Sequence, residues 1–80
     1  MIKVYSTKRC GYCQMAKRLL YKLGMEFEEV DITEDEATRE WLKAEGMRTV
    51  PQIWFGDEHV GGYNELIRRL GGNQETFKWR

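Results

Sequence analysis

The sequence is poor in the residues that build metal sites, and its charges cancel. It has two cysteines and one histidine in 80 residues, and 13 basic side chains balance 13 acidic ones. A structural zinc needs four ligands, and beyond the cysteines only His59 is an ordinary soft ligand, so no metal site is expected within one chain. The balanced charge, without long runs of one sign, argues against partners such as nucleic acid or a membrane surface.

The sequence also lacks a long apolar run. No segment is apolar enough to span a bilayer or to act as a signal peptide, because the chain opens directly in an expected strand. We therefore expect a cytoplasmic protein. Eighty residues can close one modest core, which predicts a single domain over 1–80 that acts as a monomer. Hydrophobic periodicity is lost over 73–80, so a flexible tail is expected there.

Hydrophobic periodicity predicts the element order β-α-β-α-β-β-α. Alternating apolar residues predict strands at 2–5, 27–32, 52–55 and 59–61, with a hairpin turn at 56–58. Helical spacing predicts a first helix over 11–23 that stops at Gly24, with inward positions at Met15, Ala16, Leu19, Leu20 and Leu23. A parallel crossover unit followed by an antiparallel hairpin gives an α/β fold, a mixed four-stranded sheet flanked by three helices.

Two further helices complete this pattern. The second is expected to be capped by Thr33, to bury Ala37, Trp41 and Leu42, and to end at Gly46. The third is expected to turn Leu66, Ile67 and Leu70 inward and to end at Gly71-Gly72.

Cys10 and Cys13 form a C-x-x-C pair beside a predicted β-α-β unit, which is typical of a redox site. A bridge that closes only four residues removes little unfolded-state entropy, so it is a poor structural cross-link. Residues three apart inside a helix hold their β-carbons roughly 5 to 6 Å apart, wider than a disulfide prefers. We therefore expect Cys10 just before the first helix, where Gly11 eases the bend.

The two sulfurs are expected to differ in chemistry. At the start of a helix, Cys10 faces unpaired amides and the positive end of the dipole, with Lys8 and Arg9 nearby, and this favours its thiolate. Cys10 is the predicted nucleophile. Cys13, in the first turn beside apolar side chains, should hold its proton more tightly and act second, as the resolving thiol.

Two more motifs follow. Pro51, the only proline, stands at the start of a strand after Thr49-Val50, and base rates for such bonds favour trans. Gly61-Gly62-Tyr63-Asn64-Glu65-Leu66 closes the hairpin, and its glycines serve either a strand end with positive φ or a close approach of backbone to a ligand. With Cys10-Gly11-Tyr12-Cys13 and Thr49-Val50-Pro51-Gln52-Ile53, this order of motifs resembles the glutaredoxins over residues 1–72.

The resemblance implies a thioredoxin-like fold with Pro51 cis and facing the cysteines. It also implies that the Val50 backbone pairs with the cysteinyl backbone of glutathione, while the Tyr63 amide and the Asn64 side chain receive its γ-glutamyl carboxylate. Lys8 and Arg48 would neutralise the glycyl carboxylate, and Tyr12 would flank the sulfur. The implied glutathione-binding set is Lys8, Tyr12, Arg48, Thr49, Val50, Pro51, Gly62, Tyr63 and Asn64.

Three functions are compatible with these motifs. The leading hypothesis is a glutathione-dependent thiol–disulfide oxidoreductase that acts on protein disulfides and glutathione mixed disulfides. The second is a redoxin that is reduced by a thioredoxin-reductase-type flavoenzyme and donates electrons to ribonucleotide reductase. The third is a carrier that holds an iron–sulfur cluster between the Cys10 residues of two chains with glutathione as co-ligand. His59 is expected to be a solvated hairpin residue rather than a base.

Overall fold

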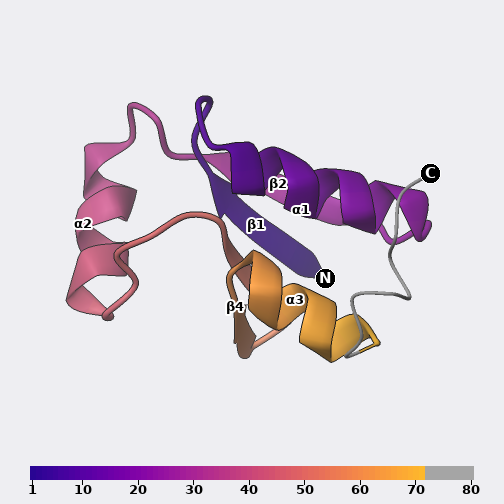
Figure 1. The fold of residues 1–80 in the computed structure, drawn as a ribbon. Helices are drawn as coiled ribbons and strands as arrows, with labels where there is room; N and C mark the ends of the chain where they lie inside the picture. Colours follow the sequence, from indigo (N-terminus) through magenta and orange to yellow (C-terminus); the bar gives the residue numbers. More distant parts are fainter. Residues whose placement is uncertain (72–80) are drawn as a thin grey trace.

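Residues 1–71 fold as a four-stranded mixed sheet with three helices, as the periodicity predicts (Figure 1). The computed structural model describes residues 1–71, so the expected tail at 73–80 and the Gly72 end of the last helix lie outside it. The elements are β1 (Ile2–Ser6), α1 (Gly11–Lys22), β2 (Phe27–Asp31), α2 (Glu36–Ala44), β3 (Gln52–Phe55), β4 (Glu58–Gly61) and α3 (Tyr63–Leu70). Within residues 1–71, no helix is long and apolar enough to cross a membrane.

The sheet order is β2-β1-β3-β4, with β1 at its centre. β1 runs parallel to β2, which follows the crossover through α1, and antiparallel to β3, which forms the hairpin with β4. The pairing sets Tyr5, near the end of β1, opposite Gln52, the first residue of β3. The loop that leaves β1 and the loop that enters β3 therefore lie at the same edge of the sheet.

Each face of the sheet carries its own apolar cluster. On one face, α1 and α3 pack through a fully buried set made of Val4, Ala16, Leu19, Leu20, Ile53, Leu66 and Ile67. On the other face, α2 and the loops around it bury Ile32, Leu42 and Met47 against the sheet. Figure 1 shows α2 set apart from α1 and α3, in agreement with this division.

Helix α2 buries less than its sequence predicts. Ala37 is exposed and Trp41 is 44% exposed, so of the three expected inward residues only Leu42 is buried. The cluster under α2 is small, and Trp41 lies at its margin, where its ring is 6.1 Å from that of Tyr5. An indole can cover an apolar edge in this way while much of its ring stays in water.

The N-cap of α2 also lies two residues later than expected. Asp35, and not Thr33, caps the helix, because its carboxylate accepts the Thr38 amide at 3.2 Å. The Thr33 hydroxyl is engaged elsewhere: it donates to Asp31 at 2.6 Å and accepts the Lys8 amide at 2.9 Å. This hydroxyl therefore ties the loop after β2 to the loop before α1.

The remaining differences concern element ends and exposed positions. Met15 and Leu23 are 37% and 45% exposed, so of the five expected inward positions of α1 only Ala16, Leu19 and Leu20 are buried. The helix also ends one residue early, at Lys22. Gly24 follows with φ of 71°, which a glycine adopts without strain. The hairpin turn is two residues long, because Glu58 already belongs to β4, and β2 ends at Asp31 rather than Ile32.

Removing a buried leucine should destabilise the domain far more than removing an exposed one. Leu66→Ala leaves a cavity in the cluster shared by α1, α3 and the sheet, so we expect a loss of about 2 to 5 kcal/mol in the free energy of unfolding. Leu23→Ala, the matched exposed change, should cost less than about 1 kcal/mol. Urea unfolding measures both, and equal losses would contradict this assignment of the core.

Candidate active site

Cys10 is the N-cap of helix α1, where the sequence predicts it. Its backbone is extended, with φ of −99° and ψ of 111°, and its sulfur accepts the Cys13 amide at 3.0 Å. That amide is one of the four at a helix start that have no partner inside the helix. A sulfur in this place lies at the positive end of the helix dipole.

Cys13 lies one turn further on and is fully buried. Burial, with the neighbouring Cys10 side chain acting in the same direction, raises the pKa of its thiol from 9.0 to about 12. A backbone hydrogen bond from Thr7 and the charge of Lys17 act the other way but do not offset burial. Both cysteines are free thiols, so the site is in its reduced form.

The turn before β3 brings a backbone carbonyl to the Cys10 sulfur. The thiol of Cys10 donates to the Val50 carbonyl oxygen across 3.5 Å. The Val50-Pro51 peptide bond is cis, as the resemblance implies and against the base rate for such bonds. The Cys10 sulfur thus has two partners of opposite kind: an amide that donates to it and a carbonyl that accepts its thiol proton.

The start of helix α3 meets the same turn. Gly61 has φ of 122°, and a Cβ there would lie 2.8 Å from the Glu65 side chain, so both backbone and space require glycine. A Cβ on Gly62 would lie 3.6 Å from the Pro51 carbonyl oxygen, which shows how closely the two motifs approach. The glycines therefore serve the strand end and a close backbone contact within the chain.

The three motifs are linked in pairs around one sulfur. Cys10 contacts Val50, Pro51 lies against Gly62, and the Tyr12 ring lies 6.0 Å from the Tyr63 ring. Tyr12 is 61% exposed, and Tyr63 is half-buried beside α1. These contacts join residues 11 to 51 positions apart in the sequence and bring the three motifs together at the half-buried Cys10.

Three residues of the expected glutathione set line a neighbouring cavity, whereas Lys8 and Asn64 lie outside its lining. Arg48, Thr49 and Val50 line a cavity of about 380 Å³ together with Thr7 and side chains of α2 that include Arg39 and Lys43. Lys8 is exposed, is not among the cavity's lining residues, and has its amide fixed by Thr33. Asn64 is exposed at the second position of α3.

Two residues at the site were not singled out from the sequence. Glu65 accepts the Gly62 amide at 2.9 Å, and its own amide and that of Gly62 lower the pKa of its carboxyl. Gln52 is a polar side chain only 6% exposed, and it donates to the Thr49 carbonyl oxygen at 2.9 Å. The signals existed: a glutamate three residues after a helix start, and a glutamine in an otherwise apolar strand.

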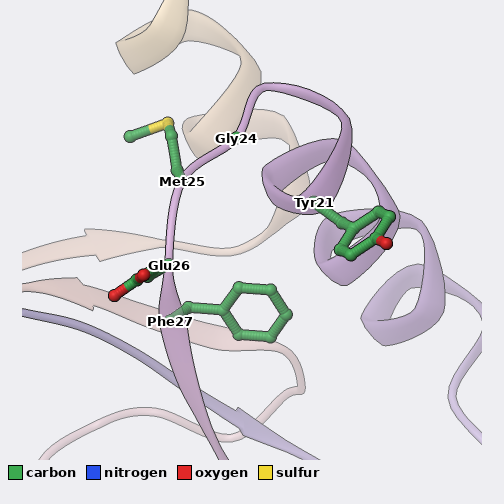
Figure 2. A pocket seen from close by; sticks show the side chains of 5 residues that line it. All are labelled: Tyr21, Gly24, Met25, Glu26 and Phe27. Carbon is green, nitrogen blue, oxygen red and sulfur yellow. The ribbon is translucent and has the colours of Figure 1, made fainter.

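A second hollow is separate from the site. It has a volume of about 470 Å³ and is lined by Tyr21, Gly24, Met25, Glu26 and Phe27 (Figure 2). Tyr21 lies eleven positions after Cys10, a rise of about 16 Å along the helix axis. This hollow therefore does not reach the cysteines. Among residues 1–71, no group of three or more His, Cys, Asp or Glu side chains is placed to hold a metal ion.

Comparison with known proteins assigns the family. The glutaredoxin family model matches residues 2–60. A glutaredoxin of Pseudomonas aeruginosa is 41% identical over 73 residues, which cover 88% of this chain and 87% of that protein. The chain belongs to the glutaredoxin family. Glutaredoxin 3 of Escherichia coli, 39% identical over 66 residues that cover 81% of this chain and 80% of that protein, supports the same assignment. This member of the family is accordingly a thiol–disulfide oxidoreductase.

Solved structures agree on the thioredoxin-like fold. A buckwheat glutaredoxin determined as a glutathione complex superposes with a TM-score of 0.76 at 29% identity, covering 86% of this chain and 66% of that one. The chain thus spans just under two thirds of the plant protein. The glutaredoxin-like NrdH-redoxin from Escherichia coli, described as having a thioredoxin-like activity profile, superposes with a TM-score of 0.75 at 29% identity. That likeness covers 90% of this glutaredoxin and 96% of the redoxin.

The two cysteines of this glutaredoxin should differ sharply toward an alkylating agent. A rise in pKa from 9.0 to about 12 lowers the thiolate fraction of Cys13 at neutral pH by about 1,000-fold. Iodoacetamide at pH 7.5 should therefore add one label per native chain, at Cys10, as mass spectrometry of peptides would show. Cys10→Ser should stay unlabelled over the same period, and the unfolded parent should take two labels. Comparable labelling of native Cys13 would contradict the burial argument.

Glu65 should stabilise helix α3 more when it is ionised than when it is protonated. A depressed folded pKa means that the benefit is present above the ordinary value of 4.5 and is lost as the pH falls below it. We expect Glu65→Ala to lower the free energy of unfolding by about 1 kcal/mol at pH 7. Because the side chain is 48% exposed, solvent screening keeps the pH-dependent part small. Urea unfolding at pH 7 and pH 3 measures the gap, with Glu65→Gln as the control that keeps an acceptor oxygen.

Proposed function

We propose that this chain is a glutathione-dependent oxidoreductase that reduces protein disulfides and glutathione mixed disulfides. The observation that carries this proposal is the meeting of three motifs at the Cys10 sulfur, with the Val50 carbonyl oxygen 3.5 Å away. An extended peptide that reached the sulfur would lie beside the Val50 backbone and could pair with it, as strands pair in a sheet. A cytoplasmic location, where glutathione is kept reduced, goes with this function.

The chemistry needs only thiols and a disulfide. The Cys10 thiolate attacks one sulfur of the substrate disulfide, the substrate S–S bond breaks, and the leaving sulfur departs as a thiolate that takes up a proton. A new disulfide now joins Cys10 to the remaining sulfur. For a glutathionylated substrate this sulfur is that of glutathione, and a second glutathione thiolate attacks it. Cys10 is released as a thiolate and oxidised glutathione leaves, so one free glutathione thiol is consumed for each substrate thiol that is released.

Reduction of a protein disulfide takes a second route through Cys13. Here the Cys13 thiolate attacks the Cys10 sulfur, the reduced substrate leaves, and a Cys10–Cys13 disulfide remains for two glutathione molecules to reduce. With a pKa of about 12, Cys13 stays protonated as long as Cys10 has not formed a mixed disulfide. Part of that rise comes from the Cys10 side chain, and once Cys10 is in a mixed disulfide its negative charge is gone. Forming the mixed disulfide therefore favours ionisation of Cys13 at the step that uses it.

The ends of glutathione have suitable partners nearby. Helix α3 makes its first internal bond from the Leu66 amide to the Gly62 carbonyl, which leaves the amides of Tyr63 and Asn64 at the positive end of the helix. We assign the γ-glutamyl carboxylate to this end. The glycyl carboxylate is assigned to the cavity beside Val50, where Arg48, Arg39 and Lys43 supply positive charge. Tyr12, which follows Cys10 by two residues and is 61% exposed, is assigned to the solvent side of the sulfur.

A second candidate function rests on the likeness to the NrdH-redoxin, which matches this chain over nearly its whole length. In that case a thioredoxin-reductase-type flavoenzyme reduces the Cys10–Cys13 disulfide, and the dithiol passes its electrons to an enzyme such as ribonucleotide reductase. The cysteine chemistry is the same for both candidates. The candidates differ in the electron donor and in the substrate that accepts the electrons. The interpretation as a carrier of an iron–sulfur cluster between two chains stays a prediction.

The deciding experiment measures turnover of a small glutathione mixed disulfide, coupled to glutathione reductase and NADPH. We expect activity in the parent, retained activity in Cys13→Ser, and a loss of at least about 100-fold in Cys10→Ser, because only Cys10 is needed as nucleophile. Reduction of a protein disulfide should fall in both variants, since that route needs Cys13.

The same samples separate the two candidates. If the parent is inactive with glutathione but oxidises NADPH when given thioredoxin reductase and a protein disulfide, the redoxin function replaces the proposal. Retained mixed-disulfide activity in Cys10→Ser would reject the assignment of the nucleophile.

A further inference from the structure

A hydrogen-bonded brace closes the turn that carries Val50. The Gln52 side chain folds back over the cis peptide, and its Nε2 donates to the Thr49 carbonyl oxygen at 2.9 Å and approaches the Thr49 hydroxyl at 3.3 Å. Thr49 and Gln52 thus hold each other across Val50-Pro51. The bonds occupy the Thr49 carbonyl and leave the Val50 carbonyl to face Cys10.

The orientation of this amide determines what His59 must do. A carbonyl oxygen can only accept, so the NH₂ group of Gln52 has to face Thr49. The Gln52 Oε1 then points away from Thr49, toward His59. The His59 Nε2 lies 2.7 Å from that Oε1, and since Oε1 can only accept, His59 must carry a proton on Nε2. The neutral Nε2–H tautomer and the imidazolium both satisfy this requirement.

The hairpin holds His59 in reach of Gln52. His59 pairs with Trp54 across the two strands, and their rings lie 4.9 Å apart. Gln52 and Trp54 share one face of β3, because side chains alternate along a strand, so Gln52 is the diagonal neighbour of His59. A register shift between Ile53 and Trp54 marks a β-bulge beside this pair, and bulges redirect side chains at functional sites.

We propose that His59 and Gln52 are positioning residues that fix the backbone of Val50 opposite the Cys10 sulfur. The connection runs from His59 to Gln52, from Gln52 to Thr49, and along the chain to Val50. It rests on the proposed function and deepens it, because the Val50 backbone is the surface assigned there to the glutathione peptide. His59 has no hydrogen bond to either sulfur within the described part of the chain, so its role is to orient and not to move a proton.

Two substitutions separate the hydrogen bond from the ring contact. His59→Phe keeps an aromatic ring against Trp54 but removes the donor to Gln52, whereas His59→Gln keeps an N–H donor and loses the ring. For the glutathione mixed disulfide, we expect His59→Phe to raise KM about 3- to 10-fold with kcat unchanged, the range for one neutral hydrogen bond. His59→Gln should stay within about 2-fold of the parent.

A third variant tests whether the two residues act as one unit. Gln52→Leu should raise KM by about the same factor as His59→Phe. The double variant should be no worse than either single change, because both remove the same support. Simple multiplication of the two effects would overturn the proposed link.

A measurement that needs no glutathione keeps this inference distinct from the proposed function. The NMR order parameter of the Val50 amide should fall from about 0.85 toward about 0.6 in His59→Phe and Gln52→Leu, while core amides such as that of Val4 keep the parent value. A lower order parameter supports the brace even if the parent has no glutathione turnover, which would reject the proposed function alone. A parent-like order parameter at Val50 in both variants, or equal effects of His59→Phe and His59→Gln, would overturn the positioning role.

Discussion

The antiparallel pairing of β1 with β3 is the constraint on which the site depends. It sets Tyr5 opposite Gln52, so the end of β1 and the start of β3 reach the same edge of the sheet. The first leads within five residues to Cys10 and the second is preceded by the turn of Val50. Each loop on its own could adopt many conformations. Held side by side by a buried central strand, they present a sulfur and a backbone carbonyl to each other across 3.5 Å.

The chemistry follows from how differently the fold treats two identical side chains. Cys10 is half-buried at the N-cap, where its sulfur receives one amide and can give its proton to one carbonyl. Cys13, three residues later, is fully buried, and burial is the largest cause of the rise of its pKa to about 12. The nucleophilic thiol and the resolving thiol thus lie within one turn of the same helix. No additional acid or base is needed to tell them apart.

Much of the architecture could be predicted because it is encoded locally. Alternating and helical spacings located all seven elements, and Gly24 marks the end of α1 as expected. The predictions were wrong where a residue has the expected spacing or type but the fold gives it a different partner. Trp41 has helical spacing, but α2 covers only a small cluster, so the indole stays at the margin. Thr33 is a residue type that often caps helices, but its hydroxyl accepts the Lys8 amide in the loop before Cys10. Asp35 is therefore the N-cap of α2.

By itself the sequence determined the order of the elements, the place of Cys10 before a helix and of Cys13 inside it, and the motifs that resemble the glutaredoxins. These features depend on side chains within about one helical turn or one hairpin of each other, so spacing alone expresses them. Only the tertiary structure decided the cis peptide at Pro51, the contact between Cys10 and Val50, and the brace from His59 through Gln52 to Thr49. Those depend on which segments the sheet places side by side, and a partner forty residues away leaves no periodic trace in the sequence.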